Sequence, residues 1–171
     1  MARILAGHRH TDSPLVRRAA PAYSGQVTAV ETAMLATRIR PRFSDTDALG
    51  HINNTVIPVW FLEAREPVLR WFAPDNDLSV GALAVVRIEV DYLNETHFGD
   101  DVEIRSGVAR IGNSSFQLRQ EVWQAGQCTA RGLATLVNFD RAARRARGIP
   151  DSIRETLEEH LWAGEDNEKA R

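Results

Sequence analysis

Cysteine is almost absent from this chain of 171 residues, in which Cys128 stands alone. A single cysteine excludes an internal disulfide and is compatible with a reducing compartment. Cys128 begins a predicted strand, and no histidine lies near it in the sequence. We therefore expect a core or half-exposed thiol there, not a nucleophile.

Long apolar runs and an excess of basic charge are also lacking. No run approaches the roughly 18 apolar residues of a membrane span. The formal net charge of −2 argues against a nucleic-acid partner. The first residues lack the apolar stretch of a secretory signal, although their arginines leave an organellar transit peptide as an alternative for residues 1–20. We expect a cytoplasmic protein that does not interact with membranes.

The length and composition suit one globular domain, with 43% hydrophobic and 26% charged residues. Residues 1–33 show no clear period, and we expect a flexible N-terminal extension there. His8, His10 and Asp12 offer metal ligands in that segment, but a solvated tail explains them better. The domain itself is predicted to cover residues 34–162, with residues 163–171 as a C-terminal tail.

Alternating apolar and polar residues predict several strands. Residues 86, 88, 90 and 92 are apolar, and charged residues lie between them. Segments 102–108 and 116–122 continue in strand-like fashion, and glycine-containing turns separate them. Residues 128–139 are apolar or small on both faces, which is typical of a strand in the interior of a sheet. Another half-buried strand is predicted from Met34 to Phe43.

A helix is predicted from Val56 to Trp71, apolar on nearly every side except for a narrow polar stripe. One sheet face cannot cover such a helix, so we expect an α+β fold with a curved antiparallel sheet wrapped around it. The uncovered surface predicts a homodimer or homotetramer. Pro58 is tolerable in the first helical turn, whereas Pro67 should kink or break the helix near Glu66.

The segment from Phe43 to Thr55 gathers chemically useful groups in one turn between that strand and that helix. It contains two carboxylates, a glycine, an imidazole and two asparagines suited to helix capping: Asp45, Asp47, Gly50, His51, Asn53 and Asn54. Unpaired N–H groups at a helix start can stabilise an oxyanion while a nearby carboxylate drives attack on a carbonyl. This arrangement favours acyl chemistry.

This turn, followed by Trp60-Phe-Leu-Glu-Ala-Arg65, resembles the signature of the hot-dog-fold acyl thioesterases. It is similar to the 4-hydroxybenzoyl-CoA thioesterase-like branch and to the plant-type acyl-ACP thioesterases. The resemblance covers about residues 34–162 and continues through Val86–Leu93, Phe98–Asp100, Ser115–Phe116 and Ile149–Pro150. It implies a hot-dog fold and hydrolysis of an acyl-CoA or acyl-ACP thioester, with no metal and no cofactor.

The resemblance also implies roles for individual residues. Asp47 takes the place of the catalytic aspartate, three residues before Gly50 and four before His51, as a general base or a nucleophile. The alternatives are that Asp47 only caps the turn, or that Asp45 takes its role, although Asp45 is expected to be an ordinary surface carboxylate. His51 belongs to the catalytic set of the plant-type pattern, but Leu49 replaces the asparagine of that pattern.

The same resemblance places the oxyanion-binding N–H at Asn54 and, with it, a substrate-binding set of Gly50, Asn53, Thr55 and Trp60. Glu63 is a rival acid in the middle of the helix, for which a structural contact is the better hypothesis. An arginine cluster after the last strand could meet coenzyme A phosphates, although such runs are usually solvated: Arg141, Arg144, Arg145 and Arg147.

Two other function classes compete with a thioesterase. One is a non-catalytic module that binds acyl thioesters, but residues 1–33 are too short and irregular for the DNA-binding domain that such a regulator often carries. The other is a hot-dog dehydratase, which would carry aspartate and histidine five residues apart in a Gly-Asp-x-Asn-Pro motif. The spacing of four between Asp47 and His51 does not match that motif.

Overall fold

The computed structural model describes residues 34–73 and 82–162, so the predicted extension (1–33) and tail (163–171) lie outside the described residues. The secondary structure elements follow the chain in this order: β1 (Leu35–Ile39), the short 3-10 helix η1 (Phe43–Asp45), α1 (Val56–Glu63), α2 (Glu66–Phe72), β2 (Ala82–Tyr92), β3 (Val102–Ile111), β4 (Ser115–Gln124), β5 (Gln127–Asp140), β6 (Arg145–Ala146) and α3 (Asp151–Glu159).

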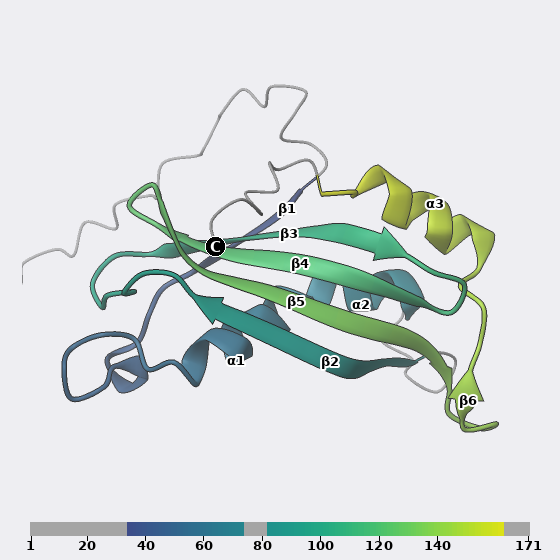
Figure 1. The fold of residues 1–171 in the computed structure, drawn as a ribbon, viewed down its shortest axis with the longest axis horizontal. Coiled ribbons are helices and arrows are strands. Elements are labelled where there is room, and N and C mark those ends of the chain that lie inside the picture. The colour runs from purple at the N-terminus through teal and green to yellow at the C-terminus, as the bar shows by residue number, and fades with distance from the viewer. Residues whose placement is uncertain (1–33, 74–81, 163–171) are drawn as a thin grey trace, which may run out of the picture.

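One antiparallel sheet contains all six strands, in the order β1-β3-β4-β5-β2, with β6 paired to β5 (Figure 1). The position of β5 between β4 and β2 confirms the interior strand predicted from its two apolar faces. Ala125 and Gly126 form the tight turn between β4 and β5, and both have positive φ, at 49° and 80°. Such a conformation suits the right-handed twist of the paired strands.

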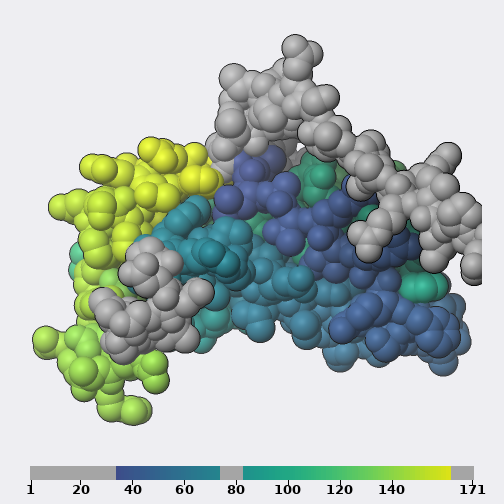
Figure 2. Space-filling model, turned by 180° about the vertical axis from the view of Figure 1, so that it is seen from behind, coloured from purple at the N-terminus to yellow at the C-terminus, as the bar shows by residue number. Residues whose placement is uncertain are grey.

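Helices α1 and α2 lie together across one face of the sheet, behind the strands in Figure 1 and across the middle of the molecule in Figure 2. This is the hot-dog arrangement that the resemblance implied. The chain forms two consecutive helices instead of one continuous helix, and the predicted break falls at Ala64 and Arg65. Pro67 has no N–H to donate to the Glu63 carbonyl, and helical bonding resumes with Leu69 N–H to the Arg65 carbonyl at 3.0 Å.

The strand before the turn is shorter than predicted. It ends at Ile39, and Phe43 begins η1 instead of ending the strand. The exchange of main-chain hydrogen bonds with β3 stops at the pair of Ile39 and Val102. Pro41, which has no N–H for a ladder, follows two residues later and is buried. The alternating sequence pattern therefore extends beyond Ile39, the last residue whose backbone pairs with β3.

The core has two clusters, one beneath each helix of the pair. Phe61 of α1 is fully buried in the first, and Val68 of α2 is fully buried in the second, together with Leu157 of α3. The backbone of β5 comes very close to α1 at Gly132, where a Cβ atom would lie 2.5 Å from Cε2 of Phe61. Glycine is therefore required there for close helix–sheet packing.

A buried polar network connects the helix break to the sheet. Arg65 is 2% exposed, and its Nε donates to Oε1 of Gln120 on β4 at 2.8 Å. Nε2 of Gln120 donates to the Phe61 carbonyl at 2.9 Å and to Oγ of Ser106 at 3.2 Å. Burial lowers the pKa of the Arg65 guanidinium below its ordinary value, because desolvation disfavours the charged form.

An apolar surface remains exposed along the sheet edge formed by β2 and on the outer side of α1. The residues of this edge surface, as we call it, are each 44–61% exposed: Val59, Leu62, Val85, Val86, Ile88, Tyr92 and Leu93. A long, apolar, unpaired edge strand is a site for association with another chain. Within residues 34–73 and 82–162, no helix is long and apolar enough to cross a membrane.

Candidate active site

The turn between η1 and α1 is organised around Asp47. Its N–H donates to the His51 carbonyl at 2.8 Å, and its carbonyl accepts the N–H of Gly50 at 3.2 Å. Gly50 has φ +84°, a left-handed conformation that favours glycine. These contacts close residues 47–51 into a compact loop that points the Asp47 side chain back at its own backbone.

The two oxygens of the Asp47 carboxylate have different surroundings. Oδ1 accepts the backbone N–H groups of Leu49 at 2.8 Å and His51 at 3.1 Å, so the capping role considered from the sequence is present. Oδ2 accepts no hydrogen bond from any described residue, and the side chain is only partly buried. One oxygen therefore holds the carboxylate in place while the other is available to water or substrate.

At the entry to α1, the backbone N–H of Asn54 is left unused by the described residues. Asn53 donates to the Asp45 carbonyl at 2.8 Å, and its own Oδ1 accepts the N–H of Thr55 at 2.9 Å and the Thr55 hydroxyl at 2.8 Å. The N–H of Asn54 reaches no acceptor in the described part of the chain. The Tyr92 hydroxyl donates to the Asn54 carbonyl at 2.8 Å and so ties this residue to β2.

The expectation for Asp45 was wrong, because its side chain is buried instead of lying on the surface. It is 3% exposed, and its Oδ2 accepts the backbone N–H of Arg42 at 2.8 Å. The Arg42 guanidinium donates to Oδ1 from Nη2 at 3.1 Å. Asp45 therefore caps η1 and is fully engaged in structure, which separates it from the chemistry expected of Asp47.

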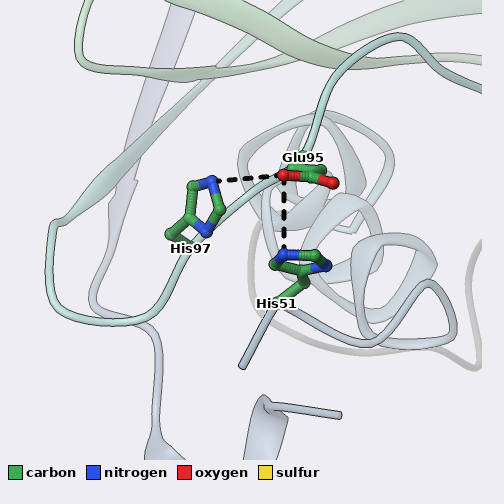
Figure 3. Close-up of side chains that lie close together, drawn as sticks. All are labelled: His51, Glu95 and His97. Atoms are coloured by element: carbon green, nitrogen blue, oxygen red, sulfur yellow. Dashed lines mark ion pairs between the residues drawn. The ribbon is translucent and has the colours of Figure 1, made fainter. Parts of the chain in front are cut away.

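His51 lies next to two residues that the sequence analysis did not single out. Its Nε2 is 3.5 Å from Oε2 of Glu95, and the same carboxylate oxygen is 3.7 Å from Nε2 of His97 (Figure 3). The two imidazole rings meet edge to face, with centroids 5.1 Å apart. Glu95 and His97 follow β2 directly, but more than forty residues separate them from His51, and sequence spacing gives no signal of such a contact.

The remaining predicted site residues differ in how far their side chains are buried. Gly50 and Thr55 are both exposed. Trp60 is 2% exposed and packs in the core beneath α1, so within this single chain it is a packing residue and not part of a substrate-facing surface. Glu63 is exposed at the end of α1, away from the turn in sequence.

The arginine cluster after β5 also contains both a partly buried and several exposed side chains. Arg147 is partly buried and its Nε donates to Oδ1 of Asn138 at 3.1 Å, which makes it a structural residue. The other three side chains are exposed around the connection to β6: Arg141, Arg144 and Arg145.

Cys128 does not have the character of a nucleophile. Its partial burial, and secondarily the negative charge of Glu121, raise the pKa of the thiol to about 11. The thiol is therefore protonated at neutral pH, whereas nucleophilic cysteines have a depressed pKa. The sequence-based expectation of a half-exposed structural thiol agrees with this environment.

Comparisons with known proteins agree with one another on the family of this chain. The family model described as the thioesterase-like superfamily matches residues 41–157. A 1,4-dihydroxy-2-naphthoyl-CoA hydrolase from Synechococcus sp. (strain CC9605) is 31% identical over 126 residues, which are 68% of this chain and 85% of that protein.

Two solved structures are similar in both sequence and fold. One is described as a predicted thioesterase from Bacillus stearothermophilus, with 42% identity, a TM-score of 0.75 and coverage of 78% of this chain and 100% of the other. The second is a thioesterase from Thermus thermophilus complexed with coenzyme A and Zn. It is 33% identical, with a TM-score of 0.64, and the match covers 71% of this chain and 95% of the other.

Proposed function

The chain belongs to the thioesterase-like superfamily and is a thioester hydrolase, and we propose that it cleaves an acyl-CoA at a site centred on Asp47. The observation that supports this site most directly is the pairing of a half-free carboxylate with an unused backbone donor in one turn. Oδ2 of Asp47 and the N–H of Asn54 are both without a partner among the described residues.

The chemistry assigns one task to each group. As a general base, the Asp47 carboxylate removes a proton from the water that attacks the thioester carbonyl carbon. The N–H of Asn54, at the positive end of α1, donates to the oxygen that becomes negative in the tetrahedral intermediate. The C–S bond then breaks, and the proton held by Asp47 passes to the departing thiolate. As a nucleophile, Asp47 would instead form an anhydride that water hydrolyses.

The names of the relatives support a choice of carrier and acyl group for the proposed substrate. Among them are hydrolases named for 1,4-dihydroxy-2-naphthoyl-CoA and a thioesterase complexed with coenzyme A. We therefore propose a coenzyme A thioester in preference to an acyl-carrier protein, and an aromatic acyl group as the first to be examined. The exposed arginines of the β5–β6 connection offer charges for the coenzyme A phosphates.

We further propose that two copies of the chain associate through the edge surface. It combines a sheet edge of 11 residues with apolar side chains on α1, the helix that follows the proposed site. Pairing of two β2 strands would continue the sheet across the dimer and cover this apolar area. Tyr92, which holds Asn54, is itself part of the surface, so the proposed site would lie close to the subunit boundary.

Replacing Asp47 with asparagine tests the proposed chemistry. The amide keeps the size of the side chain and an oxygen for the N–H groups of Leu49 and His51, but it loses the base. We expect kcat on a good acyl-CoA substrate to fall by about 10²–10⁴-fold, with little change in binding of a non-hydrolysable acyl-CoA analogue. A panel of aromatic and aliphatic acyl-CoA thioesters, followed by thiol release, identifies the substrate first.

Glu63→Gln is the matched control, since it removes an exposed carboxylate of the following helix and should leave kcat unchanged. Circular dichroism and a melting curve confirm that each variant is folded. Hydrolysis by folded Asp47→Asn at the wild-type rate would show that the carboxylate is not catalytic. A wild-type protein that binds acyl-CoA but hydrolyses no member of the panel would instead support the binding-module alternative.

A further inference from the structure

The cluster of His51, Glu95 and His97 is not used by the proposed reaction as a unit, although its composition is that of a metal-ligand set. Each residue offers one ligand atom, and these atoms all lie within 4.8 Å of one another. Figure 3 shows the two imidazoles turned toward one oxygen of the Glu95 carboxylate, with His51 and the other two residues in separate segments of the chain. The family resemblance implied a site without metal, and only His51 of the three lies in the recognised turn.

The backbone on both sides of this cluster is fixed before any ion binds. His51 and His97 form an antiparallel bridge, and the N–H of Ile52 donates to the Thr96 carbonyl at 2.7 Å. Thr96 is buried and shares a hydrogen bond of 2.8 Å with the hydroxyl of Thr129. A site held in this way loses little backbone entropy when it takes up a ligand.

His97 has a second attachment through its main chain. Its N–H donates to Oε1 of Gln124 at 2.9 Å, and its carbonyl accepts from Nε2 of the same residue at 2.8 Å. None of these contacts uses the imidazole, so the ring nitrogens of His97 stay available. The loop is therefore built like a rigid support that presents two side chains to His51.

The spacing and the donor types indicate a particular class of ion. Tetrahedral zinc with bonds of about 2.0–2.2 Å holds neighbouring ligand atoms about 3.3 Å apart. The nitrogen–oxygen separations of 3.5 and 3.7 Å at Glu95 need only a small contraction to reach this value. Two histidines and one carboxylate are a ligand set that zinc adopts with its fourth position open, whereas magnesium and calcium prefer oxygen ligands.

We propose that His51, Glu95 and His97 form a binding site for one divalent transition-metal ion of the zinc class, with one coordination position left to water. The site adjoins the proposed active site, because the backbone N–H of His51 donates to Asp47 at 3.1 Å. It is nevertheless defined by other side chains than Asp47. Metal binding can therefore fail while the hydrolase proposal stands, and the reverse also holds.

The test is metal binding to the full chain, measured without turnover. After treatment with a chelator and its removal, titration calorimetry with zinc at about pH 7.5 should give one ion per chain with a Kd below about 100 μM. Substitution with cobalt should produce the intense visible absorption of a four-coordinate ion. Millimolar magnesium should not displace either ion, because the site contains only one oxygen ligand.

Two variants remove one ligand each. His97→Ala and Glu95→Gln should each weaken zinc binding by at least tenfold, since even the loss of an outer contact to a metal ligand commonly costs 10–100-fold. The backbone bonds of His97 to Gln124 are kept in both, so we expect both variants to remain folded by circular dichroism. The matched control is His160→Ala, which removes a histidine on the C-terminal side of α3.

A second control, the double variant His8→Ala and His10→Ala, removes the histidines near the N-terminus. Both controls should bind zinc as the wild type does. The proposal is overturned if the wild type binds no zinc in this concentration range, or if magnesium competes at millimolar concentration. It is equally overturned if His97→Ala and Glu95→Gln bind like the wild type, or if the His8/His10 variant loses the ion.

Discussion

Replacing Gly132 with alanine should damage the fold at the point where α1 crosses the sheet. The new Cβ would lie 2.5, 2.9 and 3.2 Å from three ring atoms of Phe61, all of them closer than ordinary van der Waals contact. The ring is fully buried and cannot turn away into solvent. Either the ring or the whole of α1 must therefore move outward.

The magnitude follows from the cost of overpacking. Inserting a methyl group into a filled core typically costs about 1–3 kcal/mol. Alanine in place of glycine would by itself stabilise a compatible backbone by about 0.4–1 kcal/mol through the unfolded chain, and the clash must exceed this gain. Central values of these two terms leave a net loss of about 1.3 kcal/mol, so for a protein of this length we expect the melting temperature to fall by about 3–5 °C. Catalysis should fall as well, because α1 carries Asn54 at its entry and a shift of about 1 Å can cost 10²-fold.

Thermal unfolding followed by circular dichroism measures the effect, and Gly148→Ala is the matched control. A Cβ at Gly148 meets no atom within 4 Å, so this variant should stay within about 0.5 kcal/mol of the wild type. A Phe61→Leu change should rescue part of the loss in Gly132→Ala, since the two residues compete for one space. A Gly132→Ala protein that melts with the wild type would refute the close approach of α1 to β5.

Two further predictions concern the turn and the edge surface. Asp45→Asn should lower the free energy of unfolding by about 1–3 kcal/mol, because the buried side chain loses the charge that accepts from Arg42, and denaturant titration measures this loss. A midpoint equal to that of the wild type would contradict the buried position. Light scattering should give at least twice the 19.1 kDa of one chain, and Ile88→Lys on the edge surface should reduce it to a monomer while Ala109→Lys on β3 should not. A wild-type particle of one chain mass would exclude the dimer.

The parts of the fold that local sequence determines were predictable. Alternation identified β2 and β4, the apolar character of both faces placed β5 inside the sheet, and Pro67 located the helix break. Each of these conclusions depends on residues within about one strand or two helical turns of one another. The turn around Asp47 was recognisable for the same reason, since its glycine and its carboxylates occur in a single run.

Contacts between distant segments were not predictable. The burial of Asp45 depends on how η1 packs, and the approach of Glu95 and His97 to His51 depends on the bridge between two loops. Trp60 was predicted to be a substrate contact from the family resemblance, but within this chain the helix places it in the core. In each case the decisive neighbour is absent from the local sequence, so periodicity and spacing carry no information about it.

The buried polar network beneath the helix break restricts the helices to one position on the sheet. Apolar contacts between α1 and the sheet have no preferred direction, so they define the position of the helix less sharply than hydrogen bonds do. Arg65 and Gln120 tolerate no slide of the helix, since displacement would leave a guanidinium and an amide desolvated without partners. Replacing buried polar groups with well-packed apolar ones often raises the free energy of unfolding. Replacing Arg65 and Gln120 with apolar residues would remove the described hydrogen bonds that fix the position of α1 relative to β4. The turn that precedes α1 would then be less precisely aligned.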